Sequence, residues 1–328
     1  MAVRPTYLSP SAISMFYKNP NEYYMTYMTE NRPDRVPQTR PMSVGSAFDA
    51  YAKAHIHEKL FGKGADPKFE FQAIFESQVE PHQRTYALPA GRICWEEYLA
   101  SGALADLMLE LQNSAVTPRF EFEISGVIDG KREGVTRDIG GVPFKGKPDV
   151  FFVNKLGAHV ILDWKVNGYD SANGASPMQG YVRLRENGWN TGAHKNAFIQ
   201  PYKGMMINVG GTLDQYNQDW SRQLGIYAWL IGEDIGGDFV VAIDQIVCRP
   251  TGRRFAEHRL KISPDAQWKQ FASAQYVWEV VQSNHFFREM SPGDSKNKCE
   301  SLERTAKMLK DQNADDNEKW FAQMQRSI

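Results

Sequence analysis

An aspartate and a lysine separated by one residue, Asp163 and Lys165, are the pair in this sequence best suited to chemistry on a phosphodiester. Alternate side chains of a β-strand share a face, so these two project together while Trp164 projects to the opposite side. A carboxylate binds a hard divalent cation, and a neighbouring ammonium orients or helps to deprotonate water and offsets phosphate charge. The pair therefore indicates metal-assisted hydrolysis.

A second carboxylate, Asp149, stands at the start of the preceding predicted strand, where a short hairpin would bring it beside Asp163. An isolated Asp-x-Lys pattern is usually no more than a solvated strand face. Here the segments 149–153 and 160–166 are apolar enough to be central strands, where charges without a metal or a partner are costly. This context favours a metal site over the solvated face.

The surrounding pattern predicts the elements that position these residues. Ser9 followed by Pro10 is typical of a helix start, and Asn19-Pro20 ends that helix. Further helices are predicted from near residue 44, over 95–112 with a candidate break at Ser101-Gly102, over 220–231 and over 265–288. Strands are predicted at 120–124, 142–144, 149–153, 159–166 and 239–247, the first four as a meander of adjacent strands.

Composition limits the class of protein. The chain has 328 residues, 42% of them hydrophobic, which suits one large globular domain, and a net charge of -1 restricts any DNA-binding surface to a local basic patch. The three cysteines, Cys94, Cys248 and Cys299, form no CxxC pair, so neither a disulfide framework nor a zinc site is expected. No signal peptide or membrane-spanning run is evident, and we expect a cytoplasmic protein.

Four motifs occur in the order found in the PD-(D/E)XK nuclease superfamily, and the chain resembles its RecB-like branch, which includes many phage exonucleases. The resemblance spans roughly residues 8 to 250. The motifs are Leu8-Ser9-Pro10-Ser11 through Asn19-Pro20, then Gly45-Ser46-Ala47-Phe48-Asp49, then Gly146-Lys147-Pro148-Asp149 with Asp163-Trp164-Lys165, and finally Arg222-Gln223-Leu224-Gly225-Ile226-Tyr227.

The resemblance implies a restriction-endonuclease-like α/β fold, with a mixed central sheet flanked by helices. It implies that one or two Mg²⁺ or Mn²⁺ ions are bound by a set of four ligands: Asp49, Asp149, Asp163 and the backbone carbonyl of Trp164. The implied catalytic residues are Asp149, Asp163, Lys165, Gln223 and Tyr227. Gln223 and Tyr227 share a helix face, from which they could reach the phosphate, a base or Lys165; an isolated pair of this kind is more often a surface residue and a packed tyrosine.

At two positions the sequence departs from the motifs of the RecB-like branch, and these departures limit which kind of member the chain can be. Asp49 stands where the branch has a metal-binding histidine, and a carboxylate would favour hard cations; its alternative role is to stabilise a helix N-terminus. Asn19 stands where iron-sulfur members have a cysteine, and three scattered cysteines exclude a four-cysteine cluster. Glu121 and Glu123 are further candidate carboxylates, although alternating glutamates are usually the wet face of a strand.

Basic residues interleaved with aromatic ones are candidate DNA contacts, with a plain solvated loop as the alternative. The first group is Arg183, Arg185, Lys195 and Arg222. A second candidate patch contains Arg249, Arg253, Arg254, Arg259 and Lys261.

We therefore expect a nuclease domain over 1–290, with a long insertion at 166–219 that is mostly loop, and a charged helical tail over 291–328. The preferred function is a metal-dependent DNA exonuclease acting on linear DNA in phage recombination, repair or genome processing. The resemblance implies 5'-phosphate and 3'-hydroxyl ends. The alternatives are a structure-selective endonuclease and a noncatalytic DNA-binding module.

DNA is the expected partner. No Gly-x-x-x-x-Gly-Lys-[Ser/Thr] loop is present, so a helicase motor would be a separate chain. Other candidate partners are a single-strand-binding protein, an annealing protein and further copies of this chain. The expected location is the cytoplasm, that of the host if the gene belongs to a phage.

Overall fold

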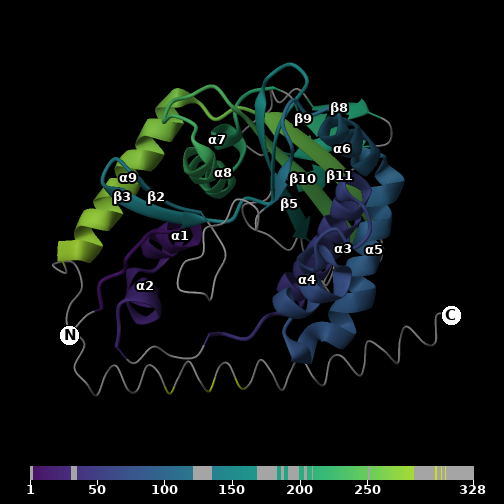
Figure 1. Cartoon of the computed structure of the whole chain (residues 1–328). Helices are drawn as coiled ribbons and strands as arrows, with labels where there is room; N and C mark the ends of the chain where they lie inside the picture. Colours follow the sequence, from purple (N-terminus) through teal and green to yellow (C-terminus); the bar gives the residue numbers. More distant parts are fainter. Residues whose placement is uncertain are drawn as a thin grey trace.

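A central β-sheet lies between two layers of helices in the computed structural model of this chain (Figure 1). The structure describes residues 3–30, 35–120, 135–167, 183–185, 188–190, 199–202, 205–208, 210–249 and 252–283, together with Glu300, Arg304 and Lys307. The expected mixed α/β fold of the restriction-endonuclease type is confirmed.

The main sheet has seven strands in the order β1-β4-β5-β10-β11-β9-β8. Their bounds are β1 Arg119–Phe120, β4 Val150–Val153, β5 His159–Asn167, β10 Val240–Arg249, β11 Gly252–Leu260, β9 Met205–Asn208 and β8 Ile199–Tyr202. The sheet is mixed, since β5 runs parallel to β10 and β11 parallel to β9, while the other neighbours are antiparallel. The strand carrying Asp163 and Lys165 is therefore an inner strand, as its apolar sequence indicated.

Two short hairpins lie outside this sheet. β2 (Val135–Ile139) pairs with β3 (Val142–Gly146), and β6 (Arg183–Arg185) pairs with β7 (Gly188–Asn190). The expected meander is therefore wrong at two of its three steps among the described residues, because β3 pairs with β2 and adjoins neither β1 nor β4, and β1 pairs directly with β4. Pro148, which has no N–H to donate to a ladder, lies in the irregular link between β3 and β4. Residues 121–134, with Glu121 and Glu123, lie outside the described part.

One face of the sheet is covered by α3 (Arg40–Phe61), α4 (Phe71–Gln78), α5 (Arg84–Ser101) and α6 (Ala103–Gln112), with two 3-10 turns at Pro67–Phe69 and Pro81–Gln83. Phe48, Tyr98 and Trp164 belong to the apolar core under these helices. The predicted break between α5 and α6 is confirmed, because Gly102 adopts the left-handed conformation with φ +84. Helix α3 begins at Arg40, four residues before the predicted start.

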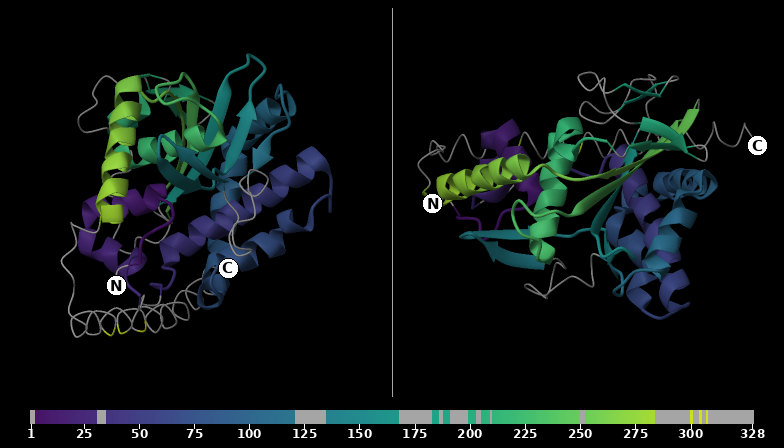
Figure 2. Two further views of the ribbon diagram at one scale, coloured as in Figure 1. Left: turned by 60° about the vertical axis from the view of Figure 1, so that its left-hand side comes forward. Right: turned by 90° about the horizontal axis from the view of Figure 1, so that it is seen from above.

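The opposite face packs against a second core formed with α1 (Pro10–Lys18), α2 (Pro20–Tyr27), α7 (Leu213–Tyr216), α8 (Gln218–Ile231) and α9 (Pro264–Ser283). As the sequence predicted, Ser9 caps α1 by accepting a hydrogen bond from the N–H of Ala12, and Pro10 occupies the first turn. Figure 2 shows α9 lying across α1 and α8 at this face.

The insertion at 166–219 is less irregular than expected. It contributes β8 and β9, which extend the main sheet beyond β11. A short alternating segment had too little periodicity to predict these edge strands, which are defined by pairing with a distant strand. Of the predicted tail, only Glu300, Arg304 and Lys307 are described, and all three are helical. Among the described helices, none is long and apolar enough to cross a bilayer.

Candidate active site

The hairpin of β4 and β5 places Asp149 beside Asp163. Val150 pairs with Leu162 across the two antiparallel strands, so the residue before Val150 comes opposite the residue after Leu162. Leu162 is fully buried among the residues under α3 and α5, whereas Asp163 faces α8. The predicted convergence of the two carboxylates is present, and it follows from strand alternation together with the register of one hairpin.

Helix α8 supplies the other half of this site. The Gln223 amide donates from Nε2 to Asp163 Oδ1 at 3.1 Å and accepts a hydrogen bond from Lys165 Nζ on Oε1 at 2.9 Å. Nε2 also lies 3.1 Å from the Tyr227 hydroxyl. Lys165 forms an ion pair with Asp163. The structure thus brings together four residues: Asp163, Lys165, Gln223 and Tyr227. The first and the last of them are 64 positions apart in the sequence.

Asp149 is held from two sides. Its Oδ2 accepts the backbone N–H of Trp164 at 3.1 Å, and its Oδ1 lies 3.3 Å from Lys53 Nζ. Lys53 Nζ also lies 2.6 Å from Asp49 Oδ2, one helical turn earlier in α3. Asp49 is therefore linked to Asp149 through Lys53. Its role as a metal ligand stays a prediction.

The electrostatics of Asp163 reflect crowding of negative charge in a buried place. The pKa of Asp163 is raised from 3.8 to about 7, mainly by burial; Lys165 opposes the shift and the nearby Asp149 carboxylate adds to it. The Asp163 side chain is 5% exposed. Two close carboxylates, one of them buried, are destabilised by their mutual repulsion, and a bound cation would remove that repulsion.

The residues present fit a hard divalent cation. Carboxylate oxygens are the ligands that Mg²⁺ and Mn²⁺ prefer, and Asp149 and Asp163 offer oxygens close together, where β4 begins beside β5. Among the described residues no group of three or more His, Cys, Asp or Glu side chains is arranged to hold a metal. A cation here would thus need ligands besides side chains, such as water, substrate and the predicted backbone carbonyl of Trp164.

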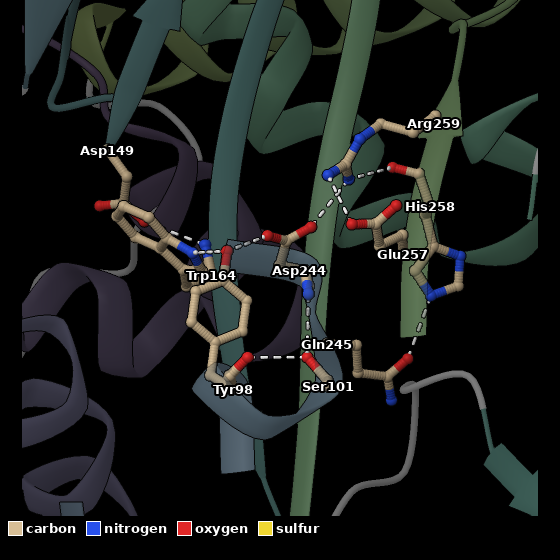
Figure 3. Close-up of polar contacts among 10 residues, drawn as sticks. Tyr98, Ser101, Asp149, Trp164, Asp244, Gln245, Glu257, His258 and Arg259 are labelled. Atoms are coloured by element: carbon tan, nitrogen blue, oxygen red, sulfur yellow. Dashed lines mark hydrogen bonds and ion pairs between the residues drawn. The ribbon is translucent and has the colours of Figure 1, made fainter. Parts of the chain in front are cut away.

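The face of β5 opposite Asp163 carries a polar network that the sequence did not reveal (Figure 3). Trp164 Nε1 donates to the Tyr98 hydroxyl at 3.3 Å, and that hydroxyl donates to Asp244 Oδ2 at 2.6 Å. Arg259 closes the network with a 2.8 Å ion pair to Asp244 and a 3.4 Å ion pair to Glu257. The Trp164 side chain thus contacts this network on one face of the sheet, while its neighbours Asp163 and Lys165 contact Gln223 on the other face.

The predicted DNA contacts are placed apart from this site or outside the described side chains. Arg222 points away from Gln223 and contacts Ser14 and Asp219. Arg259 is engaged in the buried network, so it does not belong to an exposed patch. The backbones of Arg183 and Arg185 lie in β6, Lys195 lies outside the described residues, and the side chains of Arg249, Arg253 and Arg254 are likewise not described. The proposed contacts in the insertion stay predictions.

Lys53, Tyr98 and Asp244 are the polar residues that sequence reasoning missed. The signal for Lys53 was its position four residues after Asp49 on a helix, which places both on one face. Tyr98 stands among the apolar positions of the predicted helix over 95–112, and Asp244 stands in the middle of an apolar strand. A carboxylate at such a position needs a partner, but the sequence does not name it.

Two solved structures are weakly similar to this chain. The "Putative exonuclease" from Eubacterium rectale is 12% identical, with a TM-score of 0.41, and the match covers 87% of this chain and 90% of the other. The protein SSO0001 is also 12% identical, with a TM-score of 0.25, over 86% of this chain and 96% of the other. Agreement at this level supports no functional argument. No curated protein matches the sequence.

A family model gives the decisive comparison. The model of the PD-(D/E)XK nuclease superfamily matches residues 7–181, which is more than half of the 328 residues. The matched segment contains Asp149, Asp163 and Lys165, the residues that the hairpin of β4 and β5 brings together. On this evidence, the chain belongs to the PD-(D/E)XK nuclease superfamily.

Proposed function

We propose that this nuclease is a metal-dependent deoxyribonuclease that hydrolyses the phosphodiester bonds of linear DNA as an exonuclease. The observation that carries the proposal is the contact set of Gln223, whose amide touches both Asp163 and Lys165 while Asp149 lies beside them. Family membership supports a nucleic acid substrate. The RecB-like order of the motifs, ending in Gln223 and Tyr227, supports the exonuclease subtype.

Each residue of the candidate site has a distinct role in the proposed hydrolysis. Asp149 and Asp163 would hold a divalent cation, Mg²⁺ or Mn²⁺, with the backbone carbonyl of Trp164; Asp49 is the remaining candidate ligand. When bound, the cation supplies Lewis-acid polarisation of the phosphate and lowers the pKa of water. Lys165 lies close enough to Asp163 to orient the attacking water and to offset charge that develops on the phosphate.

Gln223 and Tyr227 position the groups that take part in the reaction and do not react themselves. Gln223 fixes the ammonium of Lys165 and the carboxylate of Asp163 relative to each other, and the Tyr227 hydroxyl fixes the amide. Preorganisation of this kind matters because misplacement of a reacting group by about 1 Å can cost on the order of 100-fold in rate.

Cleavage assays test the proposal. The purified protein is incubated with linear and covalently closed DNA, single- and double-stranded, in Mg²⁺, Mn²⁺ or EDTA, alongside Asp163→Ala. We expect loss of linear DNA with intact circles, only with a metal, and a decrease of at least about 1,000-fold in Asp163→Ala.

Other results would redirect or reject the proposal. Cut circles would assign an endonuclease, and DNA binding without cleavage would assign a noncatalytic module. Cleavage in EDTA, or cleavage that survives the Asp163→Ala substitution, would reject the metal-dependent mechanism itself.

A further inference from the structure

A buried ammonium group lies between two of the acidic side chains of the active-site region. The Lys53 side chain is only 1% exposed, and its Nζ lies 2.6 Å from Asp49 Oδ2 and 3.3 Å from Asp149 Oδ1. Lysine is almost never buried to this degree unless it is paired. The two carboxylates therefore hold Lys53 in a fixed position, and the ammonium in turn neutralises part of their charge.

The position of Lys53 follows from the helix that carries it. Lys53 lies four positions after Asp49 in α3, so their side chains share one face, and that face turns toward the start of β4. The ammonium consequently lies where a cation bridging Asp49 and Asp149 would have to lie. A lysine nitrogen and a divalent cation cannot occupy that place together.

A charge balance shows what this arrangement allows. The carboxylates of Asp49, Asp149 and Asp163 and the ammonium groups of Lys53 and Lys165 leave one excess negative charge. One divalent cation converts this into one excess positive charge, which a single phosphodiester group neutralises. A second divalent cation would add two uncompensated positive charges in a half-buried site, where such charges are expensive.

We propose that Lys53 takes the place of a second divalent cation, so that the active site binds one metal ion. This inference rests on the proposed function. Asp149 and Asp163 hold the ion, and Asp49 serves to hold the Lys53 ammonium instead of binding a metal. Lys53 supplies a permanent positive charge beside Asp149 without any dependence on the metal concentration.

The test is the stoichiometry of Mn²⁺ binding without DNA, measured by isothermal titration calorimetry and by the electron paramagnetic resonance signal of free Mn²⁺. We expect one Mn²⁺ per wild-type chain and two per chain in Lys53→Met, which keeps the length of the side chain but removes its charge. Lys53→Arg, which keeps the charge, should bind one. The double substitution Asp49→Asn with Lys53→Met removes one charge of each sign, and it should also bind one.

The outcomes separate this inference from the proposed function. Two Mn²⁺ in the wild type, or one in a folded Lys53→Met protein, would overturn the role of Lys53 while leaving the nuclease proposal intact. No Mn²⁺ in the wild type would reject both. Asp163→Asn is the control for the metal site and should bind none. If Lys53→Met does not fold, as judged by circular dichroism, Lys53→Gln replaces it, because glutamine is polar but uncharged and its shorter side chain leaves the place of the ammonium open to a cation; two Mn²⁺ are again expected, and one overturns the inference.

Discussion

At the scale of single residues, the site depends on a neutral amide at its centre. Gln223 must donate to Asp163 and accept from Lys165 at the same time, and an amide carries both a donor and an acceptor. A glutamate at this position could accept from Lys165 but could not donate to Asp163 when ionised. Position 223 therefore requires an amide, and an ionised polar side chain would not make both hydrogen bonds.

Substitutions of Gln223 and Tyr227 measure this requirement. We expect Gln223→Ala to lower kcat by about 10- to 100-fold, the usual effect of losing a group that orients catalytic residues. Tyr227→Phe removes only the hydroxyl bonded to Gln223, so about a threefold to tenfold decrease is expected, in line with one hydrogen bond. Single-turnover cleavage rates with Mg²⁺ provide the measurement. A larger effect of Tyr227→Phe than of Gln223→Ala would contradict the assigned order of roles.

At the scale of elements, β5 is fixed from both faces. On one side Asp163 and Lys165 meet α8, and on the other Trp164 meets α5 through Tyr98. The Tyr98 hydroxyl bridges Trp164 and the fully buried carboxylate of Asp244 (Figure 3). Removing the bridge leaves a buried carboxylate with one donor fewer, which is costly in a low-dielectric interior.

Tyr98→Phe should therefore reduce the free energy of unfolding by about 1 to 3 kcal/mol. Tyr51→Phe is the matched control, because the Tyr51 hydroxyl makes a single long contact of 3.5 Å near the surface; a change below about 0.5 kcal/mol is expected there. Urea denaturation followed by fluorescence measures both variants. Equal losses in the two would show that the bridge to Asp244 is not stabilising.

The packing of β3 against α8 explains the glycine of the Gly146-Lys147-Pro148-Asp149 motif. A Cβ atom at Gly146 would come within 2.7 Å of the Tyr227 ring and 2.8 Å of Leu230. A side chain here would displace the helix that carries Gln223 and Tyr227. By contrast, a Cβ atom at Gly45 in α3 would meet nothing within 4 Å.

The two glycines give a matched pair of substitutions. Gly146→Ala should destabilise the protein by about 1 to 3 kcal/mol through overpacking and should also lower kcat, because Tyr227 is displaced. Gly45→Ala should raise the free energy of unfolding by about 0.5 to 1 kcal/mol, since alanine favours a helix over glycine. Thermal denaturation and cleavage rates check both. Unchanged activity in Gly146→Ala would show that α8 tolerates the shift.

At the scale of the whole molecule, the sheet buries ionisable groups on both faces, and this links stability to pH. Burial raises the pKa of Glu257 from 4.5 to about 7, with Arg259 opposing the shift and Asp244 adding to it. Glu257 therefore binds its proton more tightly in the folded protein than in the unfolded chain. Folding takes up a proton between these two values, so the free energy of unfolding falls as the pH rises through that window.

Glu257→Gln should make this fall shallower. Between pH 5 and pH 8 we expect the wild type to lose about 1 to 3 kcal/mol more stability than the variant, because the glutamine has no charge to bury. The measurement is urea denaturation at both pH values in EDTA, which keeps metals away from Asp163 in both proteins. Parallel pH profiles would contradict a raised pKa at Glu257.

The local arrangement of the candidate site residues follows from the sequence alone. Strand alternation requires Asp163 and Lys165 to share a face, helix periodicity does the same for Gln223 and Tyr227, and the apolar segments around Asp149 specify central strands. These properties follow from neighbours a few residues apart. Local rules also located the cap at Ser9 and the break at Gly102, because both depend on the chemistry of one or two residues.

Which distant residues meet depends on how the helices and strands pack together. The places of β1 beside β4 and of β9 beside β11 depend on hydrogen bonds between segments far apart in the sequence, which no local period encodes. The partners of buried charges belong to the same class: Lys53 with Asp149, and Tyr98 with Asp244, are joined by the packing of helices on a sheet. A charged residue in an apolar segment indicates that a partner must exist, but only the packing of the elements determines which residue the partner is.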